Sequence, residues 1–529
     1  MKKIIITLSF GVFAFGFSSL LYGQQVSPEI LNWYNGNKPG METEKAYKIL
    51  KKRTSSTVVV AVIDSGIDIE HEDLQGKIWK NKGETPNDGI DNDKNGYVDD
   101  VHGWNFLGNA KGENMNEANL EKTRIYRKLS EKYEKIDPET LSKDEQSEYE
   151  LYQKVKSEVE SEIEMYSSYK SQLEMMPSFL QQIPTMVGSM IGKMDYTLKD
   201  LEKWKPESED QQQIKQVARM ILTGELSIEV INDQLKQINQ MLDYNLNVSF
   251  MDREIVGDDP DDFSDRNYGN PDVEGPDALH GTHVGGIIGA VRGNGKGGDG
   301  VAENVQLMSL RAVPGGDEYD KDIALAIRYA VDNGAQVINM SFGKAYSPHQ
   351  KEVYEAFAYA DSKGVLLVHA AGNDGADVDV APNYPTSMYS FQTEPFKHFL
   401  TIGASTRYGK GGLAADFSNF GQTKVDVFAP GFEIYNTVPQ SAYQKLQGTS
   451  MAAPMVSGVA ALLKSYFPTL TMKQIKDVML QSSVSYKGKK HRKPGSGEMI
   501  DFGTLSASGG IINVSQAVKR CILLEQNKN

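Results

Sequence analysis

The chain has 529 residues, which is more than one domain usually holds. Hydrophobic residues make up 39% of it, and a net charge of −15 argues against nucleic acid or an anionic membrane as the main partner. Cys521 is the only cysteine, so no intrachain disulfide can form, and the fold must be stabilised by other means, for which bound metal is one candidate.

The first 23 residues have the pattern of a secretory signal peptide. Lys2 and Lys3 supply the charged start, residues 4–21 form an apolar stretch, and Gly23 offers a small residue at a cleavage point. A membrane anchor is the alternative, but serine and glycine residues interrupt an apolar run of marginal length. We therefore expect export to a periplasm or to the medium, with no stable membrane anchor after signal cleavage.

Residues 24–57 form a short polar segment, and a run of mostly β-branched residues follows at 58–63. Such a continuous apolar run predicts a strand that is buried on both faces, as in a parallel sheet. The strand ends at Asp64, in the place where open α/β sheets hold their chemistry. At this point, an aspartate in an ordinary strand-ending turn is an equally simple interpretation.

An acidic loop at residues 91–100 has the composition of a calcium site. Its oxygen-bearing side chains alternate around a tight glycine turn, which suits a hard cation. A true EF-hand is not expected, because the twelfth position is His102 rather than glutamate. We favour calcium over a solvated acidic turn. The candidate ligands are Asp91, Asp93, Asn95, Asp99 and Asp100.

Residues 113–250 differ in composition from the rest of the chain. Glycine nearly disappears, and apolar residues recur at helical spacing, for example at Leu151, Val155 and Val159. This pattern predicts a hairpin or bundle of long helices. A methionine-rich stretch at 175–194 could contact a protein partner, although core packing between two helices is the more frequent role of such a stripe.

Glycine-rich sequence returns near residue 252. The acidic stretch at 258–265 is either a second cation site or a solvated loop. His280 opens a run of small residues, and its place at a tight helix start favours a role as a base. His283 follows three residues later, whereas zinc sites of the HExxH type need a pair four apart with a glutamate between them. We therefore expect a structural role for His283.

From residue 305 onward, strands alternate with helices, which predicts a parallel sheet covered on both faces. The expected fold class is α/β, with a doubly wound, mostly parallel sheet and an all-α insertion. The expected strands lie at 305–313, 335–340, 365–371, 400–404 and 425–429. The expected helices lie at 320–332, 351–363 and 472–481.

The stretch at 448–463 places Ser450 at the start of an apolar helix. Backbone N–H groups at a helix start have no partner within the helix, and the helix dipole favours negative charge there. Pro454 is compatible with the first turn, because its missing N–H costs nothing at that position. This is the setting of a nucleophilic serine, although a serine or threonine cap on an ordinary core helix has the same pattern.

The side chains that acyl transfer requires thus occur along one chain. A serine nucleophile needs a base, the base needs an acid that orients it, and the oxyanion needs hydrogen-bond donors. Asp64, His280, Asn373 and Ser450 could fill these roles. Their order, aspartate before histidine before serine, is that of subtilisin rather than that of chymotrypsin or the α/β-hydrolases.

The chain resembles the subtilisin-like serine peptidases in four motifs. These are the aspartate motif at 64–68, the histidine motif at 280–284, the oxyanion-asparagine motif at 370–373 and the serine motif at 448–454. The resemblance implies that Asp64 orients His280, which acts first as general base and then as general acid. It also implies that Ser450 forms the acyl-enzyme, while Asn373 and the Ser450 N–H hold the oxyanion.

The same resemblance implies how substrate and calcium are held. Polypeptide substrates are expected to pair with two stretches that also wall the first specificity pocket. These stretches are Ser341, Phe342 and Gly343, and Ala370, Ala371 and Gly372. Asp73 resembles a calcium ligand of the family, and the loop at 91–100 resembles an extra calcium loop of some members.

Two departures from the family pattern shape the expected domains. The aspartate and histidine motifs lie far apart, and the segment before the first strand is short for a folding prodomain. The expected parts are a signal peptide (1–23), an N-terminal segment (24–57), a catalytic domain (58–112 and 251–529) and a helical insertion (113–250). The alternative to a secreted endopeptidase is a partner-binding or scaffold protein with a narrowly dedicated peptidase core.

Overall fold

The computed structural model describes residues 26–266, 268–409 and 411–527. The signal peptide expected at 1–23 lies outside these described residues. The described chain divides into two compact units. The helical unit comprises residues 122–250, and the sheet unit comprises the residues up to 121 and from 251 onward. Residues 113–121, which the sequence groups with the insertion, belong to the sheet unit by their contacts.

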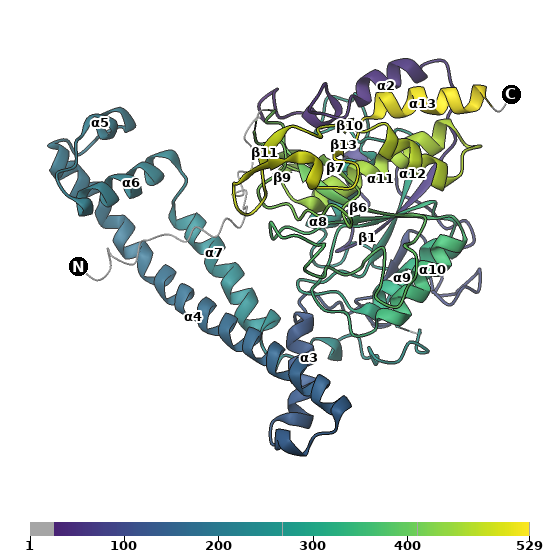
Figure 1. Cartoon of the computed structure of the whole chain (residues 1–529), viewed down its shortest axis with the longest axis horizontal. Helices are drawn as coiled ribbons and strands as arrows, with labels where there is room; N and C mark the ends of the chain where they lie inside the picture. Colours follow the sequence, from purple (N-terminus) through teal and green to yellow (C-terminus); the bar gives the residue numbers. More distant parts are fainter. Residues whose placement is uncertain (1–25, 267, 410, 528–529) are drawn as a thin grey trace. The chain divides into compact units, whose positions relative to one another are not determined.

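A nine-stranded sheet forms the centre of the sheet unit (Figure 1). Its strand order is β10-β13-β7-β6-β5-β4-β1-β3-β2, and the neighbouring strands are parallel except for β10 with β13. The strands are β1 (Val58–Asp64), β2 (Gly103–Asn105), β3 (Val305–Arg311), β4 (Val337–Met340), β5 (Leu366–Ala370), β6 (Phe399–Ser405), β7 (Val427–Pro430), β10 (Val484–Ser485) and β13 (Gly510–Ile511).

Alternate residues of β1 face two separate hydrophobic cores. Val60 and Val62 belong to the core that includes α8 and α11, whereas Ala61 and Ile63 belong to the core that includes α9 and α10. Because successive side chains of a strand point to opposite faces, helices cover both faces of the sheet, and the predicted doubly wound fold is confirmed. The helices of this unit are α2 (Thr43–Leu50), α8 (Leu279–Gly289), α9 (Asp320–Asp332), α10 (Gln350–Ser362), α11 (Thr449–Tyr466), α12 (Met472–Gln481) and α13 (Val514–Gln526).

The segment before β1 is built into the first of these cores. Met41 and Leu50 are buried in it. The backbone N–H of Val514 donates to the carbonyl oxygen of Met41, and the buried Glu42 carboxylate accepts from the side-chain amide of Asn513. Helix α2 therefore packs beside α13, as Figure 1 shows, and the N-terminal segment is tied to the end of the chain.

Two small antiparallel hairpins complete the sheet unit. The hairpin β8–β9 packs against α8, where ring nitrogen Nε2 of His283 lies 3.1 Å from the carbonyl oxygen of Ile434. Burial lowers the pKa of His283 to about 3, so this ring is neutral and structural at pH 7. The hairpin strands are β8 (Ile434–Val438), β9 (Ala442–Leu446), β11 (Lys490–Arg492) and β12 (Met499–Asp501).

The acidic stretch at 258–265 contributes to a cluster of buried charges. Asp258 pairs with Arg253 at 2.5 Å and with Lys321 at 2.6 Å, and Arg253 also pairs with Asp322 at 2.7 Å. Buried charges are stable only when they are paired in this way. The cluster ties the chain that re-enters the sheet unit at residue 251 to the first turn of α9.

The helical unit is built around one long helix, which agrees with the predicted helical insertion. Helix α4 has 49 residues and begins with a capping box between Ser142 and Glu145. Its inner side buries Leu180, Ile183 and Val187 against α6 and α7. The helices of the helical unit are α3 (Glu121–Tyr133, beginning one residue before this unit), α4 (Lys143–Ile191), α5 (Leu198–Lys203), α6 (Glu209–Thr223) and α7 (Ile228–Gln240).

The methionine-rich stretch of α4 is divided between packing and exposure. Met176 and Met186 pack against the core of the helical unit, whereas Met175, Met190 and Met194 are exposed. Core packing therefore explains only part of this stretch. No helix in the described parts of the chain combines the length and the apolar character needed to cross a membrane.

Candidate active site

Asp64 and His280 meet at the carboxyl end of β1. Asp64 is the last residue of that strand and is 1% exposed. Its Oδ1 lies 2.6 Å from Nδ1 of His280 and accepts the N–H of Ser65 at 2.8 Å. Because an ionised carboxylate only accepts hydrogen bonds, Nδ1 carries the proton, and Nε2 remains as the basic nitrogen of the neutral ring.

The surroundings of His280 raise its pKa above the ordinary value of 6.5. Burial opposes the charged ring, but the charge of Asp64 and the hydrogen bond to it outweigh burial. The next residue, Gly281, lies so close to the loop after β1 that a Cβ there would stand 2.1 Å from the carbonyl oxygen of Gly66. Glycine at this position lets α8 begin near enough for His280 to reach Asp64.

Ser450 lies in the first turn of α11. The helix begins after Gly448, whose φ of 152° favours glycine. The Ser450 hydroxyl donates to the carbonyl oxygen of Ser341 at 3.1 Å, and the Ser341 hydroxyl donates to the carbonyl oxygen of Ser450 at 2.9 Å. These two bonds hold the start of α11 against the chain that leaves β4.

The strand register relates this serine to the Asp64–His280 pair. β1 and β4 are parallel neighbours, and their last paired residues directly precede Asp64 and Ser341. His280 bonds to the first of these strand ends and Ser450 to the second. Helices α8 and α11 also pack against each other. The aspartate, the histidine and the serine therefore gather at the carboxyl edge of two adjacent strands.

Asn373 follows β5 and presents a free amide donor. Its Oδ1 accepts both the N–H and the hydroxyl of Thr449, at 2.8 and 3.0 Å. Because a backbone N–H can only donate, the amide oxygen must face Thr449, so Nδ2 is directed elsewhere. Asn373 is exposed, and within the described chain no residue accepts a hydrogen bond from its Nδ2. A donor therefore stands beside the start of α11.

The two stretches expected to bind substrate leave neighbouring strands of the sheet. Residues 341–343 follow β4, and the carbonyl oxygen of the middle one lies 2.9 Å from Nε2 of the buried His369. Residues 370–372 continue β5, and Gly372 donates its N–H to the hydroxyl of Thr449 at 3.1 Å. Both stretches are therefore fixed in place by buried or half-buried hydrogen bonds.

Arg311 contributes to this edge, although the sequence did not single it out. It ends β3 and is 1% exposed, and its guanidinium donates to the carbonyl oxygen of Ser65, the side chain of Asn105 and the carbonyl oxygen of Met115. Burial lowers the pKa of Arg311 to about 10, so it remains charged at pH 7. It fixes the turn that follows Asp64. An arginine among the apolar residues at the end of the strand expected at 305–313 was the available signal.

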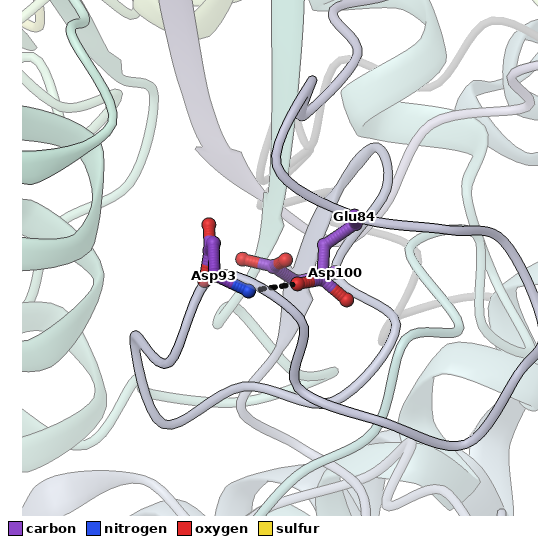
Figure 2. A group of neighbouring side chains, drawn as sticks. All are labelled: Glu84, Asp93 and Asp100. Atoms are coloured by element: carbon purple, nitrogen blue, oxygen red, sulfur yellow. Dashed lines mark hydrogen bonds between the residues drawn. The ribbon is translucent and has the colours of Figure 1, made fainter.

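Three carboxylates converge in the loop between β1 and β2 (Figure 2). One oxygen each of Glu84, Asp93 and Asp100 lies within 4.8 Å of the others. Oε2 of Glu84 is buried without a hydrogen-bond partner, and burial raises the pKa of Asp100 to about 6. Crowded carboxylate oxygens with an unsatisfied member are a donor set that suits a hard cation.

This cluster overlaps only in part with the ligands expected for the loop. Asp93 and Asp100 belong to it, and Glu84 was not expected. Asp91 accepts the N–H groups of residues 95–96, and Asp99 accepts those of residues 88–89. Asn95 donates its side-chain amide to Asp93 and Asp100. Asp91, Asn95 and Asp99 thus shape the loop, and their role as ligands stays a prediction.

Asp73 lies outside this cluster and is fully buried. Its Oδ1 accepts the side-chain amide of Asn294 at 2.6 Å, whereas its Oδ2 is buried without a partner. Burial raises the pKa of Asp73. An unsatisfied buried carboxylate oxygen is again a feature that a bound cation would relieve.

Three named proteases are similar to parts of the chain. A thermophilic serine proteinase of Bacillus sp. (strain AK1) is 40% identical over 205 residues, which is 39% of this chain and 46% of the relative. Thermitase of Thermoactinomyces vulgaris is 38% identical over 187 residues, covering 35% of this chain and 61% of thermitase. The extracellular basic protease of Dichelobacter nodosus is 34% identical over 239 residues, 41% of this chain and 37% of that protein.

The matched part of the chain thus covers between 37% and 61% of the length of these relatives. The broader match is to a family rather than to one protein. The model of the subtilase family covers residues 55–498, which include both strand ends of the candidate active site and the segment that separates Asp64 from His280. Because this match extends over well more than half of the sequence, the chain belongs to the subtilase family.

Proposed function

We propose that the protein is a serine endopeptidase that cleaves polypeptides through an acyl-enzyme. Asp64 orients His280, His280 is the general base and then the general acid, and Ser450 is the nucleophile. The observation that carries this proposal is the 2.6 Å contact between Asp64 and His280, at the edge where α11 presents Ser450. The tautomer that Asp64 imposes leaves Nε2 free to accept the serine proton.

The first chemical step moves one proton and forms one bond. As Oγ of Ser450 attacks the substrate carbonyl carbon, its proton passes to Nε2 of His280. The free hydroxyl donates to the carbonyl oxygen of Ser341, so rotation of the Ser450 side chain must redirect it. A substrate N–H that bonds to the same carbonyl oxygen would favour this rotation. His280 then protonates the leaving amine, and water repeats the sequence to release the acid.

The oxyanion requires donors that are already in place. The Nδ2 group of Asn373 has no acceptor among the described residues, and the Ser450 N–H lies at a helix start, where such groups lack intrahelical partners. Both support a hole that stabilises negative charge on the substrate oxygen. The stretches at 341–343 and 370–372 would pair with the substrate backbone on either side of its reacting residue.

A fluorophosphonate probe tests this proposal. We expect the wild type to be labelled and Ser450→Ala to remain unlabelled while keeping the wild-type melting temperature. The control is Ser362→Ala, which removes an exposed serine hydroxyl at the end of α10 and should leave labelling unchanged. An unlabelled wild type, or equal labelling of Ser450→Ala, would overturn the proposal and favour a protein with an idle core.

We further propose that calcium stabilises the sheet unit. Glu84, Asp93 and Asp100 would hold one ion, because their oxygens converge and one of them lacks a partner. Asp73, with its unsatisfied oxygen, would contribute to a second ion. When bound, calcium supplies charge compensation for buried carboxylates. No step of peptide hydrolysis is assigned to it.

We also propose how the protein is exported and how its domains are organised. The N-terminal pattern supports removal of residues 1–23 and a periplasmic or secreted protein without a membrane anchor, and the Dichelobacter relative is named extracellular. We assign residues 24–57 as a retained N-terminal segment, 58–121 and 251–529 as the catalytic domain, and 122–250 as an insertion that binds substrate proteins or another partner. The exposed methionines of α4 support that last role.

A further inference from the structure

The β11–β12 hairpin and the turn before it concentrate positive charge in a chain whose net charge is −15. Lys487, Lys489, Lys490 and Arg492 are all exposed. Within the described residues, no carboxylate forms an ion pair with any of these four side chains. The segment 487–501 as a whole holds five lysines and arginines against two carboxylates, so its net charge is +3.

The outer face of the hairpin presents part of this charge. Successive side chains of a strand point to opposite faces, and directly paired residues share a face. Lys490 and Arg492 therefore lie on one face together with Met499, which is 48% exposed. His491 lies on the opposite face, where it is 5% exposed and its ring contacts that of Phe502. The packed inner face thus fixes the direction in which the outer cations point.

The carboxylates of the hairpin leave this outer face positive. Asp501 is paired with Lys490 across the hairpin, but its Oδ1 accepts two backbone N–H groups at 2.8 Å. Glu498 is exposed in the hairpin loop and forms no ion pair within the described chain. Lys490 and Arg492 are therefore available to carboxylates of another molecule.

The hairpin loop lies against the segment that follows Asn373. A Cβ on Gly375 would stand 2.8 Å from Cα of Gly495, and a Cβ on Gly495 would stand 2.6 Å from the carbonyl oxygen of Gly375. The N–H of Gly495 donates to the carbonyl oxygen of Asp416 at 2.9 Å, and that of Gly375 donates to the carbonyl oxygen of Phe417 at 2.8 Å. The two loops are therefore anchored side by side on one segment of the chain.

This anchoring limits the distance between the outer face and the candidate oxyanion donor. Arg492 is three residues from Gly495, Gly375 is two residues from Asn373, and each residue spans at most ~3.6 Å. The Cα atom of Arg492 thus lies within about 22 Å of that of Asn373. An extended peptide covers this distance in about six or seven residues, so substrate residues near the cleaved bond are within reach of the hairpin.

We propose that the outer face of the β11–β12 hairpin binds acidic residues of the protein substrate, so that bonds with carboxylates a few positions away are cleaved preferentially. This inference rests on the proposed peptidase function and adds a binding surface to the two stretches already assigned to substrate. Lys490 and Arg492 attract carboxylates, and the guanidinium of Arg492 can bind one with two hydrogen bonds. The acidic remainder of the protein repels the same substrates, which favours this face over others.

The test uses peptides with one fixed sequence at the cleaved bond, in which a pair of aspartates is moved from about six positions before the bond to about six positions after it. Matched peptides with asparagine pairs give the reference. For the wild type at low salt, we expect the best-placed aspartate pair to raise kcat/KM about three- to tenfold, since exposed charge pairs are individually weak. In 1 M salt, where the Debye length is about 3 Å, this ratio should fall to about one.

Two double variants change the charge of the outer face in steps. Lys490→Gln with Arg492→Gln should lower the aspartate-to-asparagine ratio to about one. Lys490→Glu with Arg492→Glu should lower it below one, because like charges repel. The matched control is Lys51→Glu with Lys52→Glu, which makes the same change in net charge at two exposed lysines after α2. This control should keep the wild-type ratio.

Fluorophosphonate labelling of Ser450 is read in parallel. If the wild type is labelled but shows no preference for aspartate at any position, or if both hairpin variants keep its ratio, the hairpin proposal is overturned while the peptidase stands. An equal effect of the Lys51 and Lys52 control would also overturn it, since net charge alone would then explain the preference. If the hairpin variants keep the ratio but lose binding to vesicles that contain phosphatidylserine, the face serves a membrane surface instead. Neither labelling nor cleavage by the wild type would overturn both proposals.

Discussion

At the scale of single residues, the candidate active site is organised by groups that can only donate or only accept. The Asp64 carboxylate accepts from His280, which leaves Nε2 basic. The Thr449 N–H donates to Asn373, which leaves an amide N–H available beside α11. Each polar group thus fixes the orientation of its neighbour, and in the proposed mechanism the unused ends of the two side chains would supply the base and the oxyanion donor.

The pH dependence of activity should follow the raised pKa of His280. Only the neutral ring can accept the serine proton, so kcat/KM should fall as the pH decreases through a pKa above 6.5. Asp64→Asn removes the charge that favours the protonated ring, so the acid limb should move to lower pH. The maximal rate should also fall by about 10⁴, as in the corresponding variant of a serine protease with another fold. A pH profile of kcat/KM with an unchanged limb in Asp64→Asn would contradict this assignment.

Loss of the Asn373 donor should lower kcat with little effect on KM. We expect kcat of Asn373→Ala to fall by about 10²- to 10³-fold, which corresponds to a loss of ~2.7–4 kcal/mol of transition-state stabilisation. This is the range known for the same type of donor in subtilisin, a member of this family. Asn373→Asp keeps an acceptor for Thr449 but has no N–H, so it should lose a similar amount. Thr449→Val is the control, because it removes the hydroxyl that holds Asn373 in place but leaves the amide donor of Asn373 intact. If Asn373→Asp retained wild-type kcat in steady-state assays, Asn373 would have only a structural role.

The residues that could be predicted from sequence are those whose local setting carries the signal. Asp64 ends an apolar run and Ser450 starts a small-residue helix, so each was visible without knowledge of the rest of the chain. Glu84 was not visible, because it acquires its neighbours only when loops fold over the sheet. Arg311 is a second case, since its three partners come from separate segments.

At the scale of elements, the sheet was predictable because parallel strands buried on both faces are continuous apolar runs. The exact ends of the strands were less predictable. The strand expected at 305–313 ends at Arg311, whose side chain bonds to buried polar partners. The N-terminal segment gave no such pattern. Its short helix α2 is stable because it packs against α13, and a contact between the two ends of a chain has no local signal.

Helix α2 offers a matched pair of substitutions that tests whether the N-terminal segment is a retained part of the fold. Leu50 is 1% exposed and its neighbour Ile49 is 36% exposed. Leu50→Ala should destabilise the protein by about 2–5 kcal/mol, because it leaves a cavity in the core. Ile49→Ala should change stability by no more than about 0.5 kcal/mol. Urea unfolding of both variants measures this difference, and equal midpoints would mean that α2 is not docked in the mature protein.

The acidic loop should couple stability to calcium. Chelation should lower the melting temperature, because an ion that binds only the folded state stabilises it by about 2.7 kcal/mol when free calcium is 100 times Kd. Glu84→Gln should reduce this response. Glu498→Gln, at an exposed position of the β11–β12 hairpin loop, should respond like the wild type. If excess chelator left the melting curve unchanged, the proposal that calcium stabilises the sheet unit would be wrong.

At the scale of the whole molecule, one sheet unit is assembled from chain on both sides of a long insertion. The boundary segments are part of the sheet unit rather than of the helical unit. The N–H of Asn119 donates to the buried Asp252 carboxylate at 2.9 Å, and Glu121 pairs with the buried Lys344 at 2.7 Å. Lys344 directly follows the first stretch expected to bind substrate. Composition alone could place the insertion but not this boundary, because residues 113–121 are as polar as the helices that follow.

This boundary decides how the insertion can be removed. Because Asn119 and Asp252 are hydrogen-bonded, a short Gly-Ser bridge in place of residues 122–250 should leave the sheet unit folded. We expect that deletion to keep kcat/KM for small peptides within a few-fold while changing protein-substrate cleavage much more. Deletion of 113–250 also removes the buried Met115 and Glu121, one of the partners of Lys344, so its melting temperature should be clearly lower. If the shorter deletion impaired peptide and protein cleavage equally, the helical unit would serve folding rather than substrate recruitment.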